Sequence, residues 1–231
     1  PTATPTPTAT PSPSPSPTLS GPVAPPAREA DHSCPDDVPA AGFLDTPTSV
    51  HRAAVDCAVW WGVAKGVTAT AFQPDRGLDR AQAASFLART ILASGGSLPA
   101  DPPNAFDDDD GSVHERAIDQ LAAAGVLRGT GERTFAPTAP VTRAQLASYV
   151  VRAWAHRTGR TLPPGLDWFD DDDGSVHETA IGQAARAGFL TGTAPRVFTP
   201  SATATRGQVA SALTRVLDLL VEAGWSPTPS A

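Results

Sequence analysis

The residues that decide the fold are 141–153, VTRAQLASYVVRA. Close copies begin at Leu78 (LDRAQAASFLART) and at Ala204 (ATRGQVASALTRV). The arginine of the motif recurs every 63 residues, as Arg80, Arg143 and Arg206. Three copies in one register predict tandem repeats that share a common core.

Each copy has the sequence of a helix start. An Asp or Thr stands three residues before a Gln, which is the spacing of a capping box. The pairs are Asp79 and Gln82, Thr142 and Gln145, and Thr205 and Gln208. The arginine in the first turn opposes the positive end of the helix dipole, at a cost of up to about 1 kcal/mol. We therefore expect each arginine to have a partner anion, either a carboxylate of the protein or a group of a ligand.

The spacing of other residues predicts a first helix in each repeat, followed by a loop. In the second repeat, apolar residues at helical spacing indicate a helix over residues 113–124, and Ser112 with Glu115 repeats the capping-box spacing. Gly and Pro recur within residues 126–140 and predict a loop there. We expect the side chain of Phe135 to pack this loop against the core. Each repeat is thus predicted to be helix, loop and helix.

The second helix of each repeat is expected to be central. In the second repeat it is predicted over residues 143–157, with apolar residues on two rows, as in a largely buried helix. Another arginine follows nine residues after the motif arginine, on the opposite side of the helix. We expect these arginines to be solvated or to form salt bridges between repeats. They are Arg89, Arg152 and Arg215.

Residues 1–33 are rich in Pro, Thr and Ser and predict a disordered, extended linker. The chain begins at Pro1 and contains no Met, so we expect it to be the end of a longer protein. We divide the remainder into repeats over 34–95, 96–158 and 159–222, and a tail over 223–231. No apolar run is long enough for a membrane span.

The net charge of −7 argues against nucleic acid as a partner. No nucleophile elbow, Ser/His/Asp order, phosphate loop or Rossmann glycine pattern occurs, so we expect no catalytic residues in this region. A missing N-terminal region of the protein could still be an enzyme.

The two cysteines, Cys34 and Cys57, have three interpretations: chance thiols, half of a metal site, or a disulfide. No further ligands stand at a metal-site spacing, and a disulfide suits an exported chain. It would join the segment before the first repeat to the first helix.

The acidic run FDDDDGSVHE resembles a calcium loop but fails the EF-hand pattern, because Phe106 would occupy the first ligand position. We expect no metal site and no cofactor, while calcium binding by clustered Asp stays open. The simpler interpretation is carboxylates at the favourable end of a helix dipole.

The flanking landmarks identify a resemblance. The run F-x-D, helix, G-[VF]-[AL]-x-G, F-x-P and [TD]-R-[AG]-Q over residues 40–220 resembles three tandem S-layer homology domains. Two departures stand out. The motif ends in Gln where the family usually has Glu, and a Val starts each first helix where the family often has Trp. The valines are Val50, Val113 and Val176.

The resemblance implies a mainly α, pseudo-three-fold helical bundle on a secreted, cell-wall-attached and monomeric module. It implies that grooves between repeats bind a secondary cell-wall polysaccharide through Arg80, Arg143 and Arg206. We place Asp45, Asp108, Asp171, Gln82, Gln145 and Gln208 in a second shell around them. The alternative function is a structural or protein-interaction module, stabilised by calcium, in which neighbouring aspartates neutralise the arginines.

Overall fold

The computed structural model describes residues 22–229, so most of the predicted linker lies outside the described residues. The regular secondary structure of the described part is helical, as predicted, with only isolated β-bridges beside the helices, and long loops connect them. The helices are α1 (Arg52–Trp60), α2 (Arg80–Ala93), α3 (Glu115–Ala123), α4 (Arg143–Thr158), α5 (Glu178–Arg186) and α6 (Arg206–Glu222). None of these helices is long and apolar enough to cross a bilayer.

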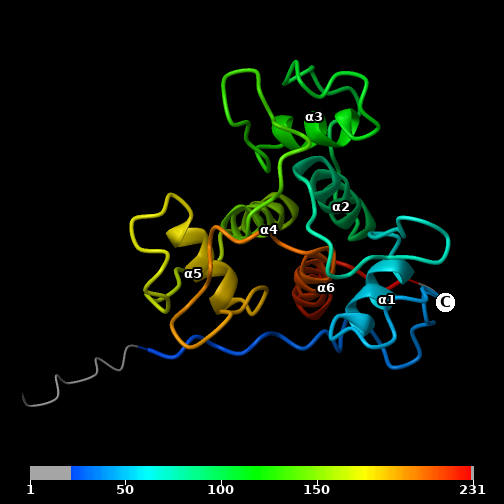
Figure 1. The fold of residues 1–231 in the computed structure, drawn as a ribbon, viewed down its shortest axis with the longest axis vertical. Helices are drawn as coiled ribbons and strands as arrows, with labels where there is room; N and C mark the ends of the chain where they lie inside the picture. The colour runs from blue at the N-terminus through cyan, green and yellow to red at the C-terminus, as the bar shows by residue number, and fades with distance from the viewer. Residues whose placement is uncertain (1–21, 230–231) are drawn as a thin grey trace, which may run out of the picture.

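The second helix of each repeat lies in the centre. The helices α2, α4 and α6 pack against one another, and the shorter α1, α3 and α5 lie outside them (Figure 1). Each outer helix packs on the central helix of the preceding repeat: α3 on α2, α5 on α4, and α1 on α6. The sequence repeats are therefore not independent folding units, because each one completes the core of its neighbour.

A ring of backbone hydrogen bonds joins the three repeats just before their central helices. The Leu78 N–H donates to the Ala204 carbonyl (3.0 Å), Ala204 to Val141 (2.9 Å), and Val141 to Leu78 (2.9 Å). All three residues are fully buried. Since they stand at equivalent positions, the ring confirms the predicted pseudo-three-fold arrangement.

The predicted caps hold for the central helices but not for the outer ones. Capping boxes form at the starts of α4 and α6, and the Asp79 side chain accepts from the Gln82 N–H. The predicted capping box of Ser112 and Glu115 is wrong. The Glu115 N–H is already bonded to the Ser112 carbonyl, and the Glu115 carboxylate accepts from Gly111.

Three equivalent valines lie outside the core at the starts of the outer helices. Val50, Val113 and Val176 are each 93% exposed. The helix predicted over residues 113–124 begins only at Glu115, so Val113 is not part of its apolar face.

The end of the predicted linker is packed. The buried Asp218 of α6 accepts from the N–H groups of His32 (2.7 Å) and Ser33 (3.1 Å) and forms an ion pair with Arg28 (2.9 Å). The Trp61 indole donates to the Ser33 carbonyl (2.8 Å). Residues 28–33 therefore belong to the folded module, contrary to the prediction of a linker up to residue 33, because these donors satisfy a buried carboxylate. We call residues 28–34 the strap.

The predicted disulfide is confirmed. Cys34 at the end of the strap is bonded to Cys57 of α1, with a Cα–Cα distance of 5.6 Å. The strap is thus attached to α1 covalently and to α6 through Asp218, so it spans the contact between the first and third repeats.

Reduction of this disulfide should lower the free energy of unfolding by about 3 kcal/mol, because the bond closes a short loop in the unfolded chain. For a protein of this size the melting temperature should fall by roughly 6–12 °C, measured by circular dichroism with and without dithiothreitol. A Cys34→Ser/Cys57→Ser variant should melt at the lower temperature, and dithiothreitol should not change its melting temperature. Two free thiols in the unfolded, unreduced protein would contradict the pairing.

Candidate functional site

The motif arginines are buried, and each contacts the loop of the next repeat. The Arg143 Nε donates to the Phe198 carbonyl (2.9 Å) and its Nη2 to the Thr191 carbonyl (2.6 Å). Arg80 makes the same bonds to Phe135 (2.8 Å) and Arg128 (3.0 Å) of the second repeat. Carbonyl oxygens, rather than carboxylates, are thus the protein partners of these guanidinium groups.

The third arginine contacts the loop of the first repeat in the same way. Arg206 donates to the carbonyls of Phe72 (2.7 Å) and Lys65 (2.8 Å) in the first repeat. Each guanidinium also lies over the ring of the phenylalanine whose carbonyl it binds, 4.3–4.6 Å from the ring centre. Burial lowers the pKa of Arg143 and of Arg206, although both remain charged at neutral pH.

The aspartates predicted for the second shell hold the same loops from the other side. The Asp108 carboxylate accepts from the N–H groups of Phe135 and Ala136, both at 2.7 Å. Asp45 and Asp171 bind the equivalent N–H groups in their own repeats. The residue after each phenylalanine has φ near +58°, a conformation that the two bonds help to hold. Asp and Arg therefore clamp one loop from two successive repeats.

The helix starts have few free N–H groups. The backbone N–H groups of Arg143 and Ala144 donate to the carbonyls of Ala202 and Pro200 in the next repeat, and the other two central helices repeat this pattern. Gln145 and Gln208 cap their own helices. These N–H groups are therefore not available to an anionic ligand.

Arg143→Ala should destabilise the fold by roughly 3–5 kcal/mol, because it removes two charge-assisted bonds and strands two carbonyls. Arg143→Lys should recover only part of this loss, since an ammonium cannot reproduce the planar fork. Arg128→Ala is the control: its side chain is exposed, and the change should stay within about 0.5 kcal/mol. Urea unfolding measures all three. An Arg143→Ala protein as stable as the parent would show that these contacts do not hold the ring.

The structure brings cations together in one groove. It lies between α2 and the start of α3, is closed by Arg206, and has a cavity of about 180 Å³. Lys65, Arg76 and Arg89 also line it, and no acidic side chain of the described residues does. We call it the first groove. Sequence analysis missed Lys65 and Arg76, which lie in loops outside the motif. A comparison of the charged residues at equivalent positions of the three repeats would have identified them as candidates.

The second arginine set does not form the predicted salt bridges. Arg89, Arg152 and Arg215 are half-buried, and none pairs with a carboxylate within residues 22–229. Arg89 and Arg215 each donate one bond to a backbone carbonyl, of Val63 (3.3 Å) and Phe189 (3.2 Å). Burial lowers the pKa of all three.

One histidine at the matched position of each repeat packs between repeats. The His114 Nδ1 lies 2.7 Å from the Ser85 Oγ on the central helix that α3 packs against. His177 pairs with Ser148 (2.8 Å) and His51 with Ser211 (2.9 Å) in the same way. Burial lowers the pKa of each of these histidines, which favours the neutral imidazole. Their place between helices favours a structural role.

A buried carboxylate of the second repeat, that of Asp109, has no partner among the described residues. Asp109 is 1% exposed, and neither of its oxygens has a hydrogen bond in the described part of the chain. Burial, then the nearby Asp119, raises its pKa to about 6. The first repeat has Thr46 at this position, and its hydroxyl donates to the Phe43 carbonyl (3.2 Å).

Asp109→Thr should stabilise the protein above pH 6 by about 1–3 kcal/mol, because the hydroxyl can donate to the Phe106 carbonyl as Thr46 does to Phe43. The folded-state pKa of Asp109 lies above its unfolded value of 3.8, so the carboxyl group costs stability once it ionises. The advantage of the variant should therefore shrink as the pH falls from 7 to 4. Unfolding curves in EDTA at both values test this, and a pH-independent difference would contradict it.

Known proteins share this repeat. Residues 105–147 and 169–210 match the S-layer homology domain family. The exoglucanase XynX of Acetivibrio thermocellus is 25% identical over 162 residues, which are 68% of this chain and 14% of that protein. The amylopullulanase of Thermoanaerobacterium thermosulfurigenes is 25% identical over 161 residues, which are 68% of this chain and 8% of that protein. The chain therefore covers only a small part of either relative.

Domains of this family are non-catalytic and generally anchor proteins to the cell wall. The first repeat lies outside the matched segments, yet its arginine, aspartate and phenylalanine make the contacts of the other two. The second and third repeats thus match the S-layer homology domain family, and the first repeat closes with them into one ring.

Proposed function

We propose that this module attaches a larger secreted protein to the bacterial cell wall by binding an anionic secondary cell-wall polysaccharide in the first groove. The observation that carries the proposal is the gathering of Lys65, Arg76 and Arg89 beside Arg206 in a groove without acidic residues of the described chain. The two relatives are named as enzymes. On that basis, the anchored part would be an enzyme.

The first groove is positively charged, whereas the whole chain is negatively charged. The protein carries −7 overall, so its long-range field repels a polyanion. A ligand is therefore recognised only at short range, where screening by salt is weakest. Two acids influence the groove from nearby, Asp79 and Asp45, and both carboxylates already accept hydrogen bonds from backbone N–H groups.

The groove cations have spare donors for a carboxylate or phosphate. Arg89 uses one nitrogen for the Val63 carbonyl and has no carboxylate partner in the described chain. Arg206 uses Nε and Nη2 for carbonyls, and its Nη1 has no partner among the described residues. A planar guanidinium with free donors suits bidentate recognition of such anions. Arg206 can thus contact the ligand only through the edge of its guanidinium that carries Nη1.

The equivalent grooves are weaker anion sites. In the second, Ala139 replaces Arg76, and the Nη1 of Arg80 is bound to the Tyr149 hydroxyl (2.6 Å). In the third, Thr191 and Ala202 replace Lys65 and Arg76, leaving Arg215. The carboxylate of Glu29, in the strap, also faces Arg215. The positive charge therefore falls from the first groove to the third.

Arg89→Ala should weaken binding to purified sacculi about tenfold to a hundredfold, the loss expected for charge-assisted bonds worth roughly 1.5–3 kcal/mol. Arg215→Ala is the matched control at the equivalent position and should change binding less than threefold. Both variants should bind less at higher salt. Co-sedimentation with sacculi measures the affinity, and circular dichroism checks that each variant is folded.

Sacculi stripped of their attached polysaccharide separate this function from the alternative. The parent protein should no longer bind them. Binding that persists on stripped sacculi, or that survives the Lys65→Ala/Arg76→Ala/Arg89→Ala variant, would contradict the proposal and favour a protein-interaction module.

A further inference from the structure

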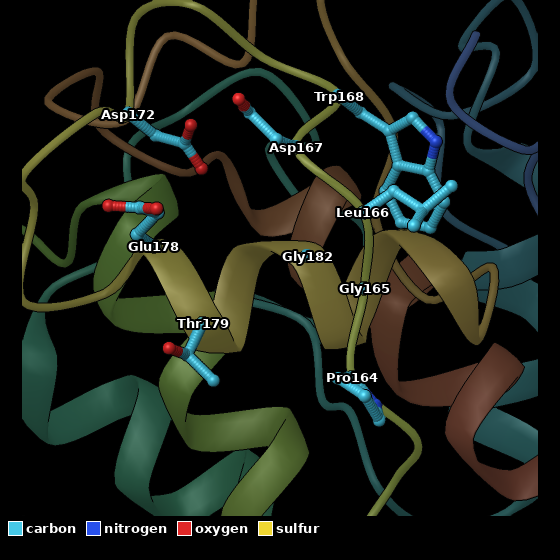
Figure 2. Close-up of a pocket in the computed structure, with 9 residues that line it drawn as sticks. All are labelled: Pro164, Gly165, Leu166, Asp167, Trp168, Asp172, Glu178, Thr179 and Gly182. Atoms are coloured by element: carbon cyan, nitrogen blue, oxygen red, sulfur yellow. The ribbon is translucent and has the colours of Figure 1, made fainter. Parts of the chain in front are cut away.

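A second polar site lies in the third repeat, away from the first groove. The carboxylates of Asp167, Asp172 and Asp173 offer oxygens that all lie within 4.8 Å of one another. Glu178 lines the same cavity of about 180 Å³. Figure 2 shows Asp167, Asp172 and Glu178 turned toward the same space beside the start of α5. Carboxylates this close repel one another unless a proton or a cation lies between them.

The second repeat carries a hydrogen-bond donor at the place that Asp167 occupies in the third. Asn104 stands at the position of Asp167, and its amide donates to Asp110, the equivalent of Asp173, at 2.8 Å. The third repeat has replaced this donor by a second carboxylate. A hydrogen-bonded pair has thus become an acidic pair. The charge of Arg196 reaches both carboxylates, but Arg196 forms its ion pair with Asp170.

Asp172 is a second and independent sign of a missing partner. It is 4% exposed, and its carboxylate has no hydrogen bond within residues 22–229. It lines the cavity and belongs to the cluster. The first repeat places the neutral Thr46 here, bonded to a carbonyl, so the fold does not need an acid at this position.

The backbone brings Asp167 to this place through two glycines. A Cβ on Gly165 would lie 2.2 Å from the carbonyl carbon of Gly182, so the loop touches α5 directly. In the second repeat the residue equivalent to Gly182 is Asp119, whose carboxylate binds the Ala105 N–H (2.9 Å). The third repeat has given up that bond, and its loop lies against α5 beside the acidic cluster.

We propose that Asp167, Asp172 and Asp173 bind a calcium ion, with Glu178 and water completing the shell. Calcium is a hard cation that takes six to eight oxygen ligands in adaptable geometry, and several carboxylates are its usual protein donors. The cavity leaves room for water at the remaining positions. The ion ties the loop before Trp168 to the start of α5, so it stabilises the third repeat and takes no part in the first groove.

The full chain should melt about 5–10 °C higher in calcium at a hundredfold excess over its dissociation constant than in EDTA. Asp167→Asn and Asp172→Asn should abolish this rise. Asp167→Asn rebuilds the Asn104–Asp110 pair of the second repeat, so it should remain folded in EDTA. Asp109→Asn, the equivalent of Asp172→Asn in the second repeat, should keep the full response to calcium.

Terbium gives a readout that stability alone does not. Trp168 lines the cavity, so Tb³⁺ bound there should luminesce when tryptophan is excited, and calcium should displace it. Trp168→Phe should remove most of the luminescence while calcium still raises the melting temperature. Titration calorimetry should count one calcium ion per chain.

Three results would overturn the site: a parent protein with the same melting temperature in calcium and EDTA, a calcium response that survives Asp167→Asn, or an equal response to magnesium. Sacculus binding by Asp167→Asn should match the parent. The proposal of a calcium site and the proposal of polysaccharide binding in the first groove can therefore be contradicted separately.

Discussion

The fold depends on an arginine of one repeat reaching the loop of the next. A guanidinium buried among carbonyls makes two charge-assisted bonds and stacks on a phenylalanine, so each contact is strong and specific in geometry. The third arginine returns to the first repeat, so no repeat ends in an open face. An open array needs caps at both ends, whereas this ring needs none.

The same contact explains a residue that looks misplaced in the sequence. A cation in the first turn of a helix opposes the dipole of that helix. Here its charge lies over the neighbouring loop, where carbonyl oxygens and an aromatic face outweigh that cost. An aspartate holds the N–H groups of the same loop, so both ends of its peptide dipoles are satisfied. The repeated F-x-P and F-x-D motifs are the two sides of one clamp.

Closing the ring leaves the three junctions free to differ. The clamp is the same in each, but the residues around it vary in charge, from the cationic first groove to the third groove, where Arg215 faces Glu29. The acidic cluster beside α5 occurs in the third repeat, where a donor and a helix carboxylate of the second repeat have been exchanged for Asp167 and Gly182. A symmetric scaffold thus carries asymmetric sites.

The sequence by itself determined the repeat, its period, the central helices with their caps, the class of fold and the pairing of two cysteines. The repeat, its period and the helix caps follow from local spacing, which depends on residues near one another in the chain. The cysteine pairing follows instead from there being two cysteines in a chain expected to be exported. Tertiary structure decided the rest. Only the ring shows that Arg143 meets carbonyls 48 and 55 residues away, that the strap satisfies buried Asp218, and that Lys65 lies near Arg89. Such contacts join residues that are far apart in the sequence and meet only because the repeats pack together. The spacing of residues within one helix therefore cannot predict them.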